Sequence, residues 1–225
     1  DEYLERTPES KHIYYIAGAD RKKLEASPHL EYFRDKDIPV LIFPRPLDEL
    51  VVNELGTYRE TAFVPASHRE GQPEQVDRDA PARDAFLLKM EQMLKERVRG
   101  VRYSSRLVKS PYCLVTTGGA MSPSLEQMMH AMNENFEPAQ RILELNPDHE
   151  LIQKVKELAS RAQNGERLGL VANLIVDSAL LLDHQVPPVH DLVHRIDDMM
   201  VQVLAADQED ASGGQSDGTD LASDS

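Results

Sequence analysis

The chain has little of several features that mark common protein classes. Its 225 residues include a single cysteine, Cys113, and no tryptophan, so an internal disulfide is excluded and a reducing compartment is favoured. No apolar run approaches the roughly 20 residues that a membrane-spanning helix needs. Acidic residues outnumber basic ones by 39 to 25, and the net charge of −14 argues against a general nucleic-acid binder. We therefore expect a soluble protein whose partners are neither membranes nor nucleic acids.

Residues 205–225 differ in composition from the rest of the chain. They carry six acidic side chains, no basic ones and one large aliphatic residue, Leu221. Such a segment cannot bury enough apolar surface to offset the entropy cost of ordering it. The composition predicts a disordered acidic tail.

The first part of the chain alternates between strand and helix patterns. Apolar runs at 12–17 (HIYYIA) and 40–43 (VLIF) predict two buried strands. Between them, residues 20–35 are rich in helix formers, and Ser27 is placed as an N-cap before Pro28. Strand, helix and strand together predict a βαβ unit with a parallel pair.

The remaining segments predict a fold of the α+β class. A small α/β (βαβ) subdomain is followed by a mixed α/β C-terminal domain that ends in a helical hairpin. Proline and glycine punctuate residues 56–81, which is typical of a boundary. Strands are predicted at 101–105 and 112–116, and helices at 47–55, 82–98, 121–133, 147–161, 166–184 and 189–204.

The last two predicted helices are unusually apolar. The helix at 166–184 is apolar around more than one side, and the helix at 189–204 has a clean apolar stripe. Pro187 and Pro188 separate them. Two interpretations remain open, namely a four-helix interface with a second copy of the chain and an intramolecular helical core.

A methionine-rich stripe marks the helix at 121–133. Its apolar residues recur at helical spacing on one face, and they are Met121, Leu125, Met128, Met129 and Met132. Such a stripe is usually ordinary core. Because unbranched, polarizable side chains also suit surfaces that bind many partners, an exposed stripe would be a binding patch.

Signals for an enzyme are weaker. His190 and His194 have the spacing of the two zinc ligands of a zincin helix, so a zinc-dependent hydrolase is the alternative hypothesis. Asp191 stands where such enzymes have glutamate, and no evident third ligand follows. Cys113 has no positioned base. We therefore predict no catalytic residue and no metal site.

Several short strings occur in a characteristic order along the chain. They are IYYI at 13–16, SPHLE at 27–31, VLI at 40–42, LDE at 47–49, RV at 97–98, VR at 101–102, SRL at 105–107, SP at 110–111 and ELNPDH at 144–149. In their order and spacing, the chain resembles the heat shock protein 90 chaperone family, nearest to its bacterial form, the high-temperature protein G type. The resemblance extends from about residue 2 to residue 204.

The resemblance implies a division of the chain and a role for its parts. Residues 1–58 would be the α/β end of the family's middle domain, 59–80 a connecting segment, 81–204 the C-terminal dimerisation domain and 205–225 the tail. The family's dimer contact implies a homodimer, with interface residues Leu174, Leu181, Ile196, Met200 and Val203. Its amphipathic helix for unfolded or partly folded client proteins implies that Met121, Leu125, Met128, Met129 and Met132 bind clients.

The resemblance also sets expectations for nucleotide and location. ATP and magnesium would bind the full-length protein outside this chain, so we expect no cofactor and no ATPase activity in this segment. Leu50 departs from the aromatic residue common at this position in the family. The C-terminal ASDS differs from the eukaryotic recruitment peptide, which favours a bacterial cytoplasmic protein.

Overall fold

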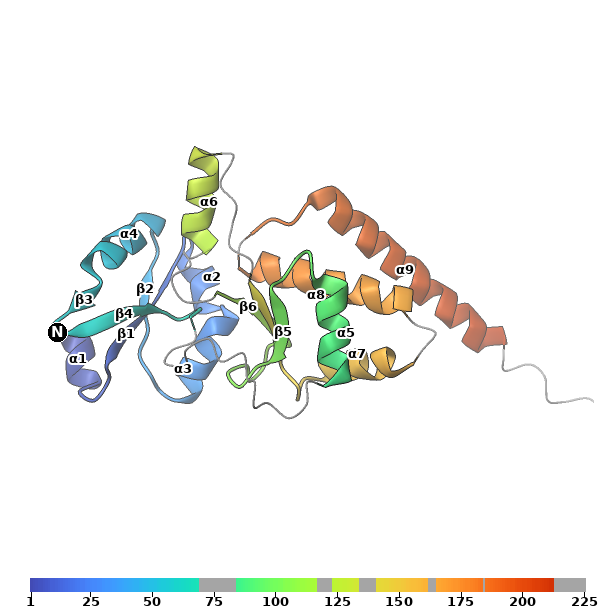
Figure 1. Ribbon diagram of the computed structural model, residues 1–225, viewed down its shortest axis with the longest axis horizontal. Coiled ribbons are helices and arrows are strands. Elements are labelled where there is room, and N and C mark those ends of the chain that lie inside the picture. The colour runs from blue at the N-terminus through green and yellow to red at the C-terminus, as the bar shows by residue number, and fades with distance from the viewer. Residues whose placement is uncertain (69–83, 117–122, 134–140, 162–164, 184, 213–225) are drawn as a thin grey trace, which may run out of the picture. The chain divides into compact units, whose positions relative to one another are not determined.

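Two small β-sheets, each with helices packed against it, organise the computed structural model (Figure 1). The structure describes residues 1–68, 84–116, 123–133, 141–161, 165–183 and 185–212. Contacts within the chain divide it into residues Asp1–Pro187 and residues Pro188–Ser225, the second unit being built on helix α9 (Val189–Ser212).

The first sheet contains a parallel core and one antiparallel edge. Its strands run in the order β2-β1-β4-β3, with β1 parallel to both β2 and β4, and β3 antiparallel to β4. The pairing of Tyr15 with Leu41 confirms the predicted parallel strands. Strands β3 and β4 were not predicted, because the prolines and glycines that follow Leu55 indicated a boundary. The strands are β1 (His12–Ala17), β2 (Leu41–Phe43), β3 (Thr57–Tyr58) and β4 (Thr61–Pro65).

The helical region predicted at 20–35 is divided into three short elements, and the N-cap predicted at Ser27 is confirmed. The segment forms α2 (Arg21–Glu25), a 3₁₀ turn η1 (Pro28–Leu30) and α3 (Glu31–Asp35). Pro28 has no N–H to donate, and the residue before a proline is pushed out of helical conformation, so Ser27 is extended. The Ser27 hydroxyl accepts from the N–H of His29, which caps the 3₁₀ turn.

Both faces of the first sheet are covered. Ile16 packs with residues of α2, η1 and α3, including Leu24 and Phe33, on one face. Its neighbour Tyr15 packs on the other face with Val52 of helix α4 (Pro46–Leu55). Alternate side chains of a strand point to opposite faces, so this arrangement explains why the run HIYYIA is apolar throughout.

The second sheet has its last strand at the centre. Strand β7 (Ile142–Leu145) lies between β5 (Gly100–Tyr103), to which it is parallel, and β6 (Tyr112–Val115), to which it is antiparallel. Strand β7 was not predicted from the sequence, although both of its partner strands were. The sequence of β7, ILEL, is only four residues long and precedes a turn and a helix. Such a short run does not by itself indicate a strand.

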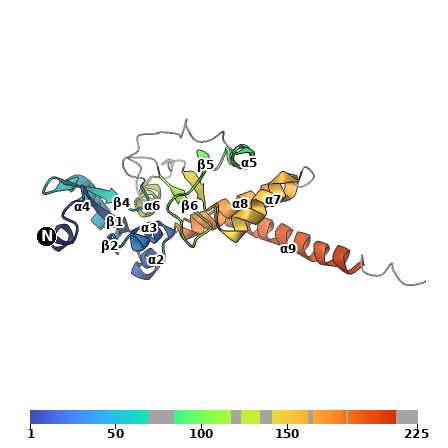
Figure 2. The same ribbon diagram turned by 90° about the horizontal axis from the view of Figure 1, so that it is seen from below.

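Three helices enclose the core against the second sheet. They are α5 (Ala85–Leu94), α7 (Glu150–Ser160) and α8 (Gly165–Leu182). Met90, Leu143, Leu168 and Ala172 are fully buried in this core. Figure 2 shows α7 and α8 side by side, in agreement with their contacts.

The remaining helices complete an α+β fold, as predicted. They are α1 (Glu2–Arg6), α6 (Pro123–Met132) and α9. Helix α9 continues to Ser212, eight residues beyond the predicted end at Leu204, while 213–225 lie outside the described residues. The hairpin and its four-helix interface stay predictions. Within the described parts of the chain, no helix has the length and apolarity to cross a bilayer.

Candidate functional site

Helix α6 changes from buried to exposed along its length. Leu125 is 2% exposed, Met128 and Met129 are half-buried, and Met132 is 78% exposed. Leu125 was expected on the client-binding face, but the structure places it among the buried residues, where it holds the helix to the protein. Met121 lies outside the described residues. The apolar stripe therefore reaches solvent only toward the C-terminal end of α6.

Helix α4 carries its apolar face outward. Leu47, Val51 and Leu55 are each more than half exposed, whereas Glu49 is 1% exposed. A surface helix normally turns its apolar stripe to the core. The spacing of Leu47, Val51 and Leu55 in the sequence predicts that they share one face of a helix, but it does not indicate whether that face meets the core or solvent.

Helices α4 and α6 contact each other (Figure 1). Each presents apolar side chains to solvent, and the contact brings two sets that are far apart in the sequence to one region of the protein. We call their exposed and half-buried apolar residues the α4–α6 surface: Leu47, Leu50, Val51, Leu55, Met128, Met129 and Met132. Clustered apolar exposure of this kind marks a site for a protein or an apolar ligand.

A carboxylate of the first subdomain binds a loop of the second. The Glu31 carboxylate accepts from the N–H groups of Val108, Lys109 and Ser110 at 2.7, 2.8 and 3.0 Å. The Glu31 carboxylate therefore binds three backbone N–H groups of a loop that is distant in the sequence. Burial alone would raise the pKa of Glu31, but these hydrogen bonds and the Ser110 hydroxyl lower it overall.

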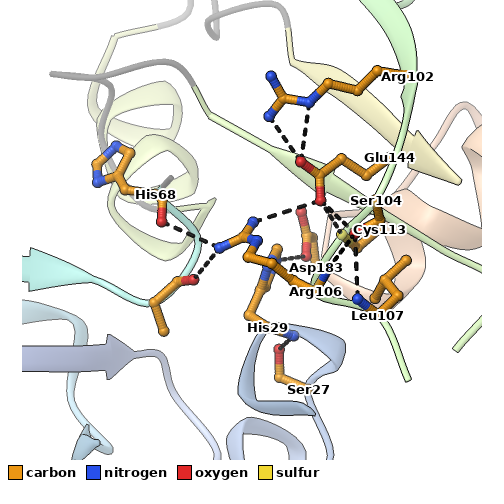
Figure 3. Close-up of polar contacts among 11 residues, drawn as sticks. Ser27, His29, His68, Arg102, Ser104, Arg106, Leu107, Cys113, Glu144 and Asp183 are labelled. Carbon is orange, nitrogen blue, oxygen red and sulfur yellow. Dashed lines mark hydrogen bonds and ion pairs between the residues drawn. The ribbon is translucent and has the colours of Figure 1, made fainter. Parts of the chain in front are cut away.

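Glu144 of β7 organises the adjoining polar contacts (Figure 3). Arg102 donates to it at 2.8 Å, and Arg106 forms an ion pair with it at 3.7 Å. Arg106 also donates to the carbonyl oxygens of Ala66 and His68, at 3.3 and 3.2 Å. Burial would raise the pKa of Glu144, yet the two arginines and Ser104 lower it overall.

A buried histidine and aspartate lie beside this network (Figure 3). His29 Nε2 is 3.1 Å from Oδ1 of Asp183, the residue that follows the end of α8. Both side chains are about 95% buried. Together with Glu31, Arg106 and Glu144, they form what we call the polar junction. Helix α4 packs on the first sheet, and α6 follows β6 of the second sheet in the sequence, so the α4–α6 contact and the polar junction both join parts of the chain that belong to different sheets.

Cys113 faces the polar junction but is not poised for nucleophilic chemistry. Its Sγ lies 4.0 Å from Glu144 Oε2. Burial and the negative charge of Glu144 raise the pKa of the thiol well above its ordinary value. The thiol therefore remains protonated at neutral pH.

Helix α9 exposes most of its apolar side chains. Three of the predicted interface residues, Ile196, Met200 and Val203, are 41 to 51% exposed. On α8, Leu181 is 48% exposed and Leu174 is half-buried. The predicted interface set therefore contains four exposed side chains and one that is half-buried.

In the part of the chain that the structure describes, the histidine pair of α9 belongs to no larger group of metal ligands. The Nε2 atoms of His190 and His194 lie 3.3 Å apart on the exposed helix. Among the residues that the structure describes, no group of three or more histidine, cysteine, aspartate or glutamate side chains could hold a metal ion. The zinc-hydrolase alternative gains no support from this arrangement.

The chain has an α+β fold in which α4, α6 and α9 expose apolar side chains. Comparison with known proteins gives the particular family. The sequence model of the Hsp90 protein family matches residues 1–224, and the chain belongs to this family. The bacterial type predicted from the short strings is confirmed by its relatives.

Three relatives illustrate the match, each a chaperone protein HtpG. The chain is 35% identical over 223 residues to that of Geobacter sulfurreducens, covering 94% of this chain and 34% of the relative. For Treponema denticola the identity is 32% over 206 residues, covering 87% and 31%. For Bacillus subtilis it is 32% over 192 residues, covering 81% and 30%. The chain spans about a third of the length of these relatives.

Proposed function

We propose that this chain is the dimerisation and client-binding segment of an ATP-dependent molecular chaperone. The observation that carries the proposal is the exposure of apolar faces on α4, α6 and α9 in a chain of the Hsp90 family. ATP and magnesium act outside this segment in the proposal, and the protein works in the bacterial cytoplasm. The segment by itself has no ATPase activity.

Dimerisation uses the exposed apolar side chains of α9. A helix with Val193, Ile196 and Met200 in water gains stability when a second copy covers these side chains, by about 25 cal/mol for each Å² of apolar area buried. The two copies form a symmetric contact, in which the same patch serves both. A lasting dimer holds two attached ATPase regions at high effective concentration, so that their association becomes intramolecular.

Client binding uses the α4–α6 surface. Partly folded proteins expose apolar segments of varied sequence, and leucine and methionine side chains adapt to many shapes because they are flexible. The half-buried Met128 and Met129 provide the inner part of the surface, and Met132 provides its outer end. Affinity for any one client is modest, because adaptable surfaces sacrifice specificity.

Light scattering behind size exclusion tests dimerisation. Over a hundredfold dilution series, we expect a molar mass close to twice the 25.4 kDa of the chain. A mass of one chain at every concentration would contradict the dimer.

Fluorescence anisotropy with a permanently unfolded probe, reduced and carboxymethylated lactalbumin, tests client binding. We expect saturable binding that weakens when Met128 and Met129 are both changed to serine, with the dimer retained. The matched control is Leu88→Ser, which removes an exposed leucine from α5, outside the α4–α6 surface. Equal weakening by the control would contradict the assignment of the surface.

A further inference from the structure

Helix α6 is held to the protein at one end. Among its described side chains, only Leu125 and Glu126 are buried, and both lie near its start. Met132 lies six residues beyond Glu126, which is about 9 Å along a helix at 1.5 Å per residue. A small change of tilt at the buried end therefore displaces the exposed methionine.

A buried ion pair determines the orientation of that end. The Glu126 carboxylate is paired with the Arg141 guanidinium, and their side chains are 3 and 5% exposed. Arg141 is in turn attached to the second sheet, because its carbonyl accepts from the N–H of Arg99 at 2.8 Å. An ion pair has a directional requirement that the apolar contact of Leu125 does not have.

Gln185 joins this pair to the end of α8. Its side-chain oxygen accepts from Arg141, and its side-chain nitrogen lies 3.3 Å from Glu126 Oε2, to which it donates. Its backbone N–H donates to the carbonyl of Leu180 at 2.9 Å, which continues the last turn of α8. We call Glu126, Arg141 and Gln185 the base clamp of α6.

We propose that the base clamp couples client binding on α6 to the end of α8, with its three members acting as positioning residues. This proposal rests on the proposed client-binding function. A client that restrains α6 restrains Glu126, and through Gln185 it restrains the last turn of α8. Coupling between two binding equilibria is reciprocal, so a change at the end of α8 alters client affinity by the same factor.

The variant Gln185→Ala separates coupling from folding. It cuts the connection between α6 and α8 and leaves the Glu126–Arg141 pair in place, so no buried charge loses its partner. The matched control is Asn173→Ala. It removes another side-chain amide of α8, one that binds Arg97 at 3.0 Å and has no contact with α6 among those the structure describes.

Hydrogen exchange of the segment 178–187, with and without the unfolded lactalbumin probe, measures the coupling in the full chain. We expect the probe to slow exchange there by about fivefold, the low end of typical coupling, in the wild type and in Asn173→Ala. In Gln185→Ala, we expect the probe to bind and the protection to disappear.

Two further outcomes distinguish the proposals. If the wild type binds the probe and exchange at 178–187 does not change, the coupling is wrong and client binding stands. Protection that persists in Gln185→Ala, or that disappears equally in Asn173→Ala, also overturns the coupling. If the wild type does not bind the probe, the client-binding function fails, and the coupling fails with it.

Discussion

Helices α8 and α9 follow each other in the sequence and are both rich in apolar residues, but their side chains have opposite environments. In α8, Leu168, Ile175 and Val176 are buried against the second sheet and its helices. In α9, Ile196 and Met200 are exposed. An apolar stripe thus predicts that one face of a helix packs against other apolar side chains. It does not predict whether those side chains belong to the same chain or to another one.

Helices α4 and α6 each combine buried and exposed apolar side chains. Val52 and Leu125 are buried and fasten their helices, whereas Val51 and Met132 are exposed. The exposed members do not stabilise this fold by burial. We infer that they are available to contact a second copy of the chain or another protein.

The largest expected effect comes from placing a charge in the covered helix. Ile175→Asp puts an unpaired carboxylate into the core and should destabilise the fold by about 3 to 5 kcal/mol. The free energy of unfolding, from urea titration at a low protein concentration, measures it. Ile196→Asp under the same conditions should cost less than about 1 kcal/mol, because the side chain is exposed. Similar costs for both variants would remove the contrast between α8 and α9.

Ile196→Asp should instead change the oligomeric state. Covering its carboxylate in an interface carries the cost of an unpaired buried charge, so we expect a single-chain mass of 25.4 kDa by light scattering. The control Leu88→Asp alters a comparably exposed leucine on α5 and should leave the dimer intact. A dimer that survives Ile196→Asp would show that this residue lies outside the interface.

Lowering the pH should weaken the polar junction before it weakens the apolar core that α8 covers. The pKa of Glu144 is lower in the folded protein than its ordinary value of 4.5, so its ionised form stabilises the fold above that pH. This stabilisation is lost as the pH falls below 4.5 through the folded pKa. At neutral pH, Glu144→Gln should cost about 1.5 to 3 kcal/mol, the contribution of hydrogen bonds to a charged group.

Urea titrations from pH 7 to pH 3 measure this dependence. We expect the difference in stability between the wild type and Glu144→Gln to shrink as the pH falls. A difference that stays constant over the whole range would mean that Glu144 does not contribute through its charge.

The smallest expected effect is at the exposed end of α6. Met132→Ser should leave the free energy of unfolding within about 0.5 kcal/mol of the wild type. It should weaken binding of the unfolded lactalbumin probe by about tenfold if the methionine becomes buried on binding, since that burial is worth about 1.5 kcal/mol or more. Anisotropy titration measures it, and unchanged affinity would place the client elsewhere on the α4–α6 surface.

Sequence patterns predicted the parts of the fold that local chemistry controls. The continuous apolar runs at 12–17 and 40–43 indicated strands buried on both faces, and β1 and β2 are parallel as expected. The short strings indicated the family. The patterns missed β7, because its four residues become a strand only between β5 and β6. The pattern of Ser27 before Pro28 predicted an N-cap, and the structure confirms it.

Only the tertiary structure determined which side chains come together at the α4–α6 surface. Periodicity records which residues share a face, and it identified the stripes of α4 and α6 on that basis. Whether a stripe meets the core or solvent depends on contacts between distant segments. Glu31 binds a loop more than seventy residues away in the sequence. Glu126 of α6 binds Arg141, which lies just before β7. Those partners come together only when the chain has folded, because no local pattern encodes a contact over such separations.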